Sequence, residues 1–150
     1  MSGLQDAVDG VLARYAMAID DDRLEDWLDL FAEDCRYRIA ARDNVEAGLP
    51  VSVVYADGRA MLADRVAALR RANVFEAQRY RHVLGRALVE AGPPVAARAG
   101  YHVARIMREG DLMLFSAGEY RAIFDEALRI SEMTVVYDNA RIDTLLALPL

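Results

Sequence analysis

The sequence from Tyr15 to Ile39, YAMAIDDDRLEDWLDLFAEDCRYRI, decides the expected fold, because its apolar spacing changes there from helical to strand-like. From Val8 to Ile19, apolar residues recur every three or four positions, which predicts an amphipathic helix. These residues are Val8, Val11, Leu12, Tyr15, Ala16 and Ile19. Asp22, followed three residues later by Glu25, then matches the capping box of a second helix. The apolar face of that helix would be Leu24, Trp27, Leu28 and Phe31.

A strand is expected directly after these helices, where Cys35, Tyr37 and Ile39 alternate with charged residues. The range 42–50 contains turn-forming residues and reads as a loop. A short strand over 51–56 and a third helix follow. The apolar stripe of this third helix is Leu62, Val66 and Leu69.

The second half of the chain is predicted to form long strands separated by turns. The expected strand ranges are 81–91, 95–108, 112–124, 128–137 and 141–146. Tight turns between neighbours predict an antiparallel meander. Gly85, Gly100 and Gly118 lie inside these ranges, where glycine often marks a bulge or a sharp bend. The sequence therefore predicts an α+β fold in which about three helices from the N-terminal half pack on a strongly curved antiparallel sheet.

Length and charge restrict what this chain can be. Its 150 residues fit a single domain, 1–150, and no segment is apolar enough to cross a membrane. A net charge of -6 argues against nucleic acid or an anionic membrane as a partner. Cys35 is the only cysteine, so no disulfide can form within the chain, and a buried thiol is expected. The acidic start of the sequence resembles no targeting signal, so a cytoplasmic location is expected.

Three segments resemble the β (small) subunits of Rieske-type aromatic-ring-hydroxylating dioxygenases, which have an NTF2-like, SnoaL-like cone fold. They are IDDDRLEDWLDLFAEDCRYRI at 19–39, DRVAALRRANVFEAQRYRH at 64–82, and ISEMTVVYDNARIDTLLALPL at 130–150. The resemblance spans nearly the whole chain. It implies an NTF2-like cone and a structural role in an oxygenase complex for the catabolism of aromatic compounds.

The resemblance also implies partners and cofactors. The α subunit of such a complex holds a Rieske [2Fe-2S] cluster and a mononuclear iron, while β subunits form a homotrimer in an α3β3 assembly. The residues agree independently, because a Rieske centre needs two cysteines and two histidines. With Cys35, His82 and His102 as the available Cys and His residues, this chain is expected to hold no cofactor and no metal. No residue is then expected to be catalytic.

A second hypothesis is a stand-alone cone-fold dehydratase or isomerase. Enzymes of this kind use Tyr, Asp and His side chains in an apolar cavity for acid-base chemistry. The candidates here are Tyr15, Asp20, His82 and His102. Otherwise Tyr15 is a core aromatic residue, Asp20 belongs to a turn or cap, and the histidines make structural hydrogen bonds. A binding module with an inert cavity is a third class.

Arginine is unusually frequent in the predicted strands. The arginines are Arg79, Arg81, Arg86, Arg98, Arg105, Arg121, Arg129 and Arg141. Such residues either protect exposed sheet edges from aggregation or form protein interfaces, and the sequence favours neither. The chain also ends in apolar residues, namely Leu145, Leu146, Leu148 and Leu150. We expect this end to dock against the fold or a neighbouring subunit.

Overall fold

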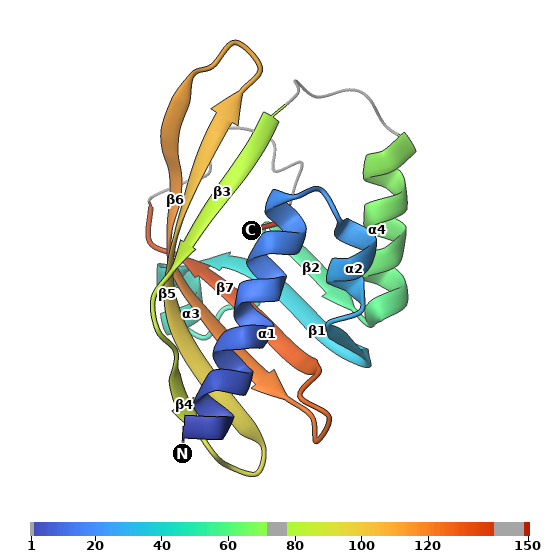
Figure 1. Cartoon of the computed structure of the whole chain (residues 1–150), viewed down its shortest axis with the longest axis vertical. Helices are drawn as coiled ribbons and strands as arrows, with labels where there is room; N and C mark the ends of the chain where they lie inside the picture. The colour runs from blue at the N-terminus through green and yellow to red at the C-terminus, as the bar shows by residue number, and fades with distance from the viewer. Residues whose placement is uncertain (1, 72–77, 140–148) are drawn as a thin grey trace.

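The computed structural model describes residues 2–71, 78–139 and 149–150 (Figure 1). The helices in these ranges are α1 (Ser2–Asp20), α2 (Leu24–Leu28), α3 (Arg42–Glu46) and α4 (Arg59–Arg71). The strands are β1 (Phe31–Ala41), β2 (Val54–Asp57), β3 (Gln78–Leu84), β4 (Leu88–Glu90), β5 (Val95–Met107), β6 (Leu112–Phe124) and β7 (Ile130–Tyr137). The α+β fold class predicted from the sequence is confirmed.

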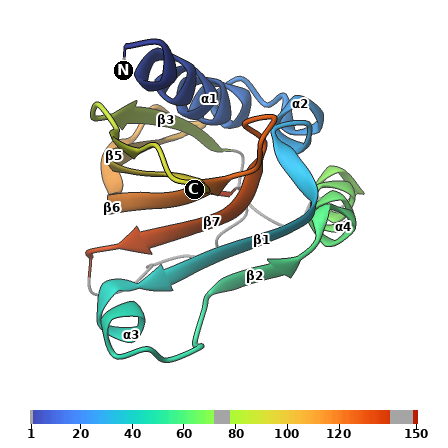
Figure 2. The same cartoon turned by 90° about the horizontal axis from the view of Figure 1, so that it is seen from below.

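The strands described form one mixed sheet in the order β2-β1-β7-β6-β5-β3. β3 and β4 pair with successive parts of β5. Neighbouring strands are antiparallel, except that β1 and β7 run parallel. Figure 2 shows the sheet bending around an interior that α1 closes on one side. The predicted antiparallel meander is therefore formed by β5, β6 and β7. Strand β1 extends the sheet by pairing with β7 in the parallel direction.

Helices α1, α2 and α4 lie along the concave side of the sheet (Figures 1 and 2). The predicted stripe of α4 is correct, since Leu62 and Val66 are buried and Leu69 is partly buried. Helix α3 lies at the other side of the sheet, beyond the ends of β1 and β7 (Figure 2). Its first residue, Arg42, forms an ion pair with Asp138 at the end of β7. The convex side of the sheet is otherwise left largely uncovered.

Aromatic side chains fill the interior between α1 and the sheet. The ring of Tyr15 lies 5.7 Å from that of Trp27 and 5.2 Å from that of Tyr120. Trp27 packs edge-on against Phe31 at 4.8 Å, and Tyr101 stacks on Tyr120 at 4.9 Å. Edge-to-face and offset pairs of this kind add about 0.5–1.5 kcal/mol each beyond their buried area. The residues of the opening segment thus form the core of the fold.

The capping box predicted for the second helix is wrong. Helix α2 begins after Arg23, and no side chain caps it. Asp22 instead adopts a left-handed backbone conformation, with φ of 58°. Its carboxylate accepts a hydrogen bond from Arg70 on α4 at 2.7 Å, and Glu25 binds the same guanidinium at 2.9 Å. Both acidic groups therefore connect α2 to α4 rather than capping α2.

Three details of the sheet and its connections differ from the prediction. The expected loop 42–50 contains α3, and the expected strand 81–91 is two strands, β3 and β4, separated at Gly85. The register of β5 and β6 shifts between Val103 and Ala104 rather than at a glycine. Gly118 is required by close approach, because a Cβ there would clash with the carbonyl oxygen of Val136. The strand expected at 141–146 lies outside the described residues.

Candidate functional site

Asp20 and His82 meet in the interior, because the last residue of α1 lies against the middle of β3. Their side chains are 1% and 0% exposed. Oδ1 of Asp20 lies 2.6 Å from Nδ1 of His82, and Oδ2 accepts a hydrogen bond from the backbone N–H of His82 at 2.8 Å. Arg81 lies 3.6 Å from the same carboxylate. Asp20 thereby orients the imidazole so that Nε2 faces away from the carboxylate.

The oriented imidazole has the arrangement that acid-base catalysis uses. Nε2 of His82 has no hydrogen-bond partner among the described residues, and neither do the buried hydroxyls of Tyr80 and Tyr120. The Tyr80 and His82 rings are 6.1 Å apart. Burial raises the pKa of both tyrosines, so they stay neutral donors at ordinary pH. The same contacts also tie α1 to β3, which is a purely structural role.

Tyr15, the third candidate, is engaged in a different contact. Its hydroxyl donates to the backbone oxygen of Leu150 at 2.6 Å, and the Tyr37 hydroxyl lies 3.2 Å from the same oxygen. Burial is the largest cause that raises the pKa of Tyr15 well above its usual value. Leu150 is fully buried, so the expected docking of the chain end is confirmed for this residue. Leu145, Leu146 and Leu148 lie outside the described residues.

His102, the fourth candidate, does not face the interior. Tyr101 and Val103 point inward and are buried, so the alternation of β5 places His102 on the exposed convex side. It lines a shallow surface depression there together with Val83 and Asp138. His102 therefore does not share the interior with the other three candidates. The structure brings together Asp20 and His82, with Tyr15 nearby in the core.

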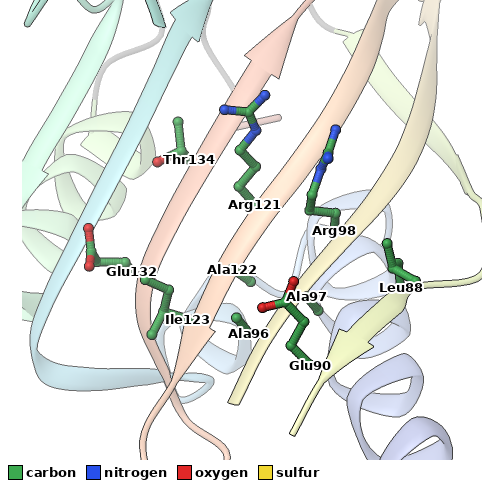
Figure 3. A pocket seen from close by; sticks show the side chains of 10 residues that line it. All are labelled: Leu88, Glu90, Ala96, Ala97, Arg98, Arg121, Ala122, Ile123, Glu132 and Thr134. Atoms are coloured by element: carbon green, nitrogen blue, oxygen red, sulfur yellow. The ribbon is translucent and has the colours of Figure 1, made fainter. Parts of the chain in front are cut away.

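A groove on the convex side, which we call the outer groove, has a volume of about 260 Å³. Its residues are Leu88, Glu90, Ala96, Ala97, Arg98, Arg121, Ala122, Ile123, Glu132 and Thr134 (Figure 3). Strand register places Arg98, Arg121 and Thr134 in one row across three strands. Ala96, Ile123 and Glu132 form the next row, and Glu90 pairs with Ala96. The groove is thus cationic at one end and acidic at the other.

Glu119 holds the two groove arginines together. Arg98 and Arg121 are direct cross-strand partners, a placement that is unfavourable for like charges without a counter-ion. Glu119 accepts a hydrogen bond from Arg98 at 2.7 Å and another from Nε of Arg121. Partial burial alone would raise the pKa of Glu119, but these two hydrogen bonds outweigh it and lower the pKa. Both arginines stand out in the sequence as strand arginines, but Glu119 does not, because the register between strands is not visible in the sequence.

Metal-ligating side chains are dispersed over the fold. In the ranges 2–71, 78–139 and 149–150, no three His, Cys, Asp or Glu side chains are grouped to hold an ion. Cys35 is buried as a free thiol on β1, His82 is bound to Asp20, and His102 is on the convex side. None of the helices described is both long and apolar enough to cross a bilayer.

The sequence profile described as ring hydroxylating beta subunit matches residues 14–144. Over 143 residues the chain is 43% identical to subunit beta 1 of the terminal oxygenase component of terephthalate 1,2-dioxygenase from Comamonas sp, covering 92% of this chain and 93% of that protein. It is 37% identical to the anthranilate 1,2-dioxygenase small subunit of Burkholderia cepacia, covering 91% of this chain and 88% of that protein.

Solved structures show the same likeness. A crystal structure from Novosphingobium aromaticivorans, of the β subunit of a protein assigned as an aromatic-ring-hydroxylating dioxygenase, has a TM-score of 0.90 and 43% identity. The match covers 99% of this chain and 98% of that one. An NTF2-like protein of unknown function from Exiguobacterium sp. has a TM-score of 0.60 at 15% identity, covering 87% of this chain and 99% of that one. The second likeness concerns the fold alone and confirms the predicted NTF2-like class.

Proposed function

This chain belongs to the ring hydroxylating beta subunit family and is the small subunit of a multicomponent aromatic-ring-hydroxylating dioxygenase; from this premise we propose that it forms a homotrimer that carries iron-bearing α subunits in an α3β3 complex. The observation that carries the proposal is the family match over residues 14–144. In this complex the chain has an assembly role, and the oxygen chemistry takes place in the α subunit.

The residues of the chain support this division of labour. A Rieske cluster requires two cysteines and two histidines, whereas this sequence has one cysteine and two histidines. His82 uses Nδ1 to bind Asp20, and His102 lies on the opposite side of the sheet. We therefore assign the [2Fe-2S] cluster and the mononuclear iron to the α subunit and no catalytic residue to this chain. The Asp20–His82 contact then serves to fix α1 on β3.

Substrate class and location are part of the same proposal. The two relatives at 43% and 37% identity are named for terephthalate and anthranilate, which are both aromatic carboxylates. An aromatic carboxylate is accordingly the first substrate class to test with the assembled complex. The free, buried thiol of Cys35 fits a reducing compartment, which supports a cytoplasmic location.

The test is co-expression with the α subunit gene of the same organism. We expect a tagged β chain to retain the α subunit at a 1:1 ratio, and the complex to consume oxygen with an aromatic carboxylate and a reductant. Light scattering of the β chain alone should give the mass of a trimer. A β chain that stays monomeric, or an α subunit equally active and equally assembled without it, would contradict the proposal.

A second candidate function rests on one observation, the free Nε2 of the oriented His82. If the chain is instead a dehydratase or isomerase, it should convert a cyclic alcohol or ketone without any partner. His82→Gln should then lower the rate by about a hundredfold or more, as expected when an acid-base group is removed. Equal rates for the wild type, the variant and buffer would exclude this function for the substrates assayed.

A further inference from the structure

Tyr15 and Tyr37 bring two buried hydroxyls to one backbone oxygen, that of Leu150. The Tyr15 hydroxyl lies 2.6 Å from this oxygen and the Tyr37 hydroxyl 3.2 Å from it, while the two hydroxyls are 3.2 Å apart. A carbonyl oxygen has two lone pairs, so two donors fill its hydrogen-bonding capacity. Burial is the largest cause that raises the pKa of both phenols, so both remain protonated donors at ordinary pH. The two hydroxyls therefore form a receptor for one carbonyl oxygen inside the fold.

Aromatic packing holds both phenol rings in place independently of Leu150. The ring of Tyr15 lies 5.7 Å from that of Trp27 and 6.2 Å from that of Phe31. The ring of Tyr37 meets the same two rings edge-on, at 5.5 Å and 5.9 Å. These four rings come from α1, α2 and β1. The donors are thus preorganised, and loss of Leu150 would leave them where a carbonyl ligand needs them.

A small pocket adjoins this receptor between α2 and α4. Its volume of about 10 Å³ is room for about one water molecule, and both Tyr37 and Pro149 line it. Trp27 lines it as well, and its buried Nε1–H has no acceptor among the described residues. Arg65 of α4 is an exposed residue of the same lining, which places the pocket near the surface. The site therefore contains a third donor that residues 149–150 leave unused.

We propose that the interior of this chain contains a binding site for a small apolar amide or ketone, and that residues 149–150 occupy it as an internal ligand. The backbone oxygen of Leu150 takes the position of the ligand's carbonyl oxygen. Its side chain, which is fully buried, fills the space for a branched aliphatic group. The site is separate from the Asp20–His82 pair. It goes beyond the assembly role, because it gives the subunit a binding site that its own chain keeps closed.

The ligand class follows from the groups that surround Leu150. Two neutral phenols can satisfy a neutral carbonyl oxygen completely, whereas a carboxylate would bring an unpaired charge into an apolar interior. The walls of the adjoining pocket include the apolar side chains of Leu24, Leu62 and Val66. They favour an aliphatic group over a polar one. The ligand therefore combines one carbonyl group with an aliphatic part of about the size of a leucine side chain.

The direct test is a shortened chain that stops after Leu148 and so lacks the internal ligand. One probe is N-acetyl-prolyl-leucinamide, which copies residues 149–150; the other is 4-methyl-2-pentanone, which keeps only the carbonyl and an isobutyl group. At about ten times its dissociation constant, each probe should raise the melting temperature of the shortened chain by roughly 3–6 °C. The full chain should show no shift, because its site is filled. An equal shift in the full chain would refute the internal ligand.

Removing both hydroxyls tests what recognises the carbonyl. In the shortened chain, Tyr15→Phe/Tyr37→Phe keeps both rings and should not reduce stability, because the hydroxyls there have lost their acceptor. We expect its affinity for the ketone, measured by calorimetry, to fall about tenfold or more. The matched control is Tyr55→Phe, which removes a hydroxyl from an exposed residue of β2 and should leave the affinity unchanged. Equal affinities in the donor variant and the shortened chain would show that the hydroxyls do not form the site.

Leu150→Gly gives an independent result if the shortened chain does not fold. This variant keeps the backbone oxygen on both hydroxyls and removes only the isobutyl group. A preformed site stays open after this change and binds xenon, as apolar cavities do, whereas the full chain with Leu150 does not. Xenon NMR measures the difference. An interior that collapses and binds no xenon would mean that residues 149–150 are ordinary core packing, which overturns the inference.

Discussion

Oδ1 of Asp20 lies 2.6 Å from Nδ1 of His82, and the other oxygen of the same carboxylate binds the backbone N–H of His82. One carboxylate thus holds both the ring and the main chain of a residue 62 positions away in sequence. Both side chains are buried, so water cannot replace either contact. The contact joins the end of the first helix to the third strand at the centre of the fold.

His82→Gln should therefore destabilise the subunit. The variant loses the imidazole contact and leaves the buried carboxylate with a poorer partner, at a cost of roughly 3 kcal/mol. For a chain of this size, that corresponds to a melting temperature about 6–12 °C lower. Thermal unfolding followed by circular dichroism measures the change. The control is His102→Gln on the exposed side, which should unfold within about 2 °C of the wild type.

Turnover separates this structural role from catalysis. In reconstituted complexes that are fully assembled and loaded with iron, His82→Gln should leave turnover per complex unchanged. A large loss of turnover in such complexes would show that the Asp20–His82 pair takes part in the reaction.

Tyr15 and Tyr37 should show strongly non-additive effects on stability. Each hydroxyl donates to the backbone oxygen of Leu150, so in Tyr15→Phe or Tyr37→Phe the other hydroxyl still satisfies it. We expect each single variant to lose about 0.5–1 kcal/mol. The double variant leaves the buried oxygen without a donor and should lose about 1–3 kcal/mol more than the sum. Urea denaturation of the wild type, the two single variants and the double variant measures the four free energies of unfolding. Additive losses in stability would contradict the prediction.

Glu119 should make stability depend on acidic pH. Its pKa is lower in the folded chain than the ordinary value of 4.5, so its contribution is full above that value and is lost as the pH falls through the folded pKa. The stability difference between the wild type and Glu119→Gln should be about 1 kcal/mol at neutral pH and should shrink below about pH 4.5. Urea denaturation across this range measures it. A difference independent of pH would mean that the carboxylate charge is unimportant.

Metal analysis tests the division of labour between the subunits. The purified chain should contain no stoichiometric iron after chelation and should consume no oxygen with an aromatic substrate and a reductant. The reason is the ligand set, since one cysteine and two histidines cannot form a Rieske cluster. Elemental analysis provides the readout. Iron at about one atom per chain that survives chelation would refute the assignment.

The elements of the fold were largely predictable because its long strands carry regular patterns. The ranges expected for β5 and β6 agree with the structure to within one residue. Helix α3 was not predictable, because it has five residues and none of them is buried, so no apolar stripe marks it. The failed capping box at Asp22 had a tertiary cause, because Arg70, 48 residues away, binds the acidic groups that the local pattern assigned to a cap.

The candidate sites were predictable only in part. Residue type alone selected Asp20 and His82, and the structure joins them. His102 has the same residue type, but strand alternation turns it to the other side of the sheet. The outer groove depends on the register of four strands, which sequence periodicity does not specify. Pairing between distant strands is therefore the information that was missing.

The end of the chain provides the last prediction, which concerns truncation after Asp143. Leu150 is fully buried, and its backbone oxygen satisfies two core tyrosines. Pro149 lines a small pocket together with Trp27 and Leu62. Removing residues 144–150 takes away this apolar cover and leaves the hydroxyls of Tyr15 and Tyr37 without their acceptor.

We expect the truncated chain to be insoluble or to form a smaller oligomer than the full chain, because its exposed core favours aggregation over ordered assembly. Light scattering of the soluble fraction gives the oligomer mass. The matched control is Leu150→Ala, which keeps the backbone oxygen and removes only the side chain. Loss of the buried side chain should cost about 2–4 kcal/mol without changing the oligomer mass. A truncated chain that remains a soluble trimer would show that the buried C-terminal residues are dispensable for both core and assembly.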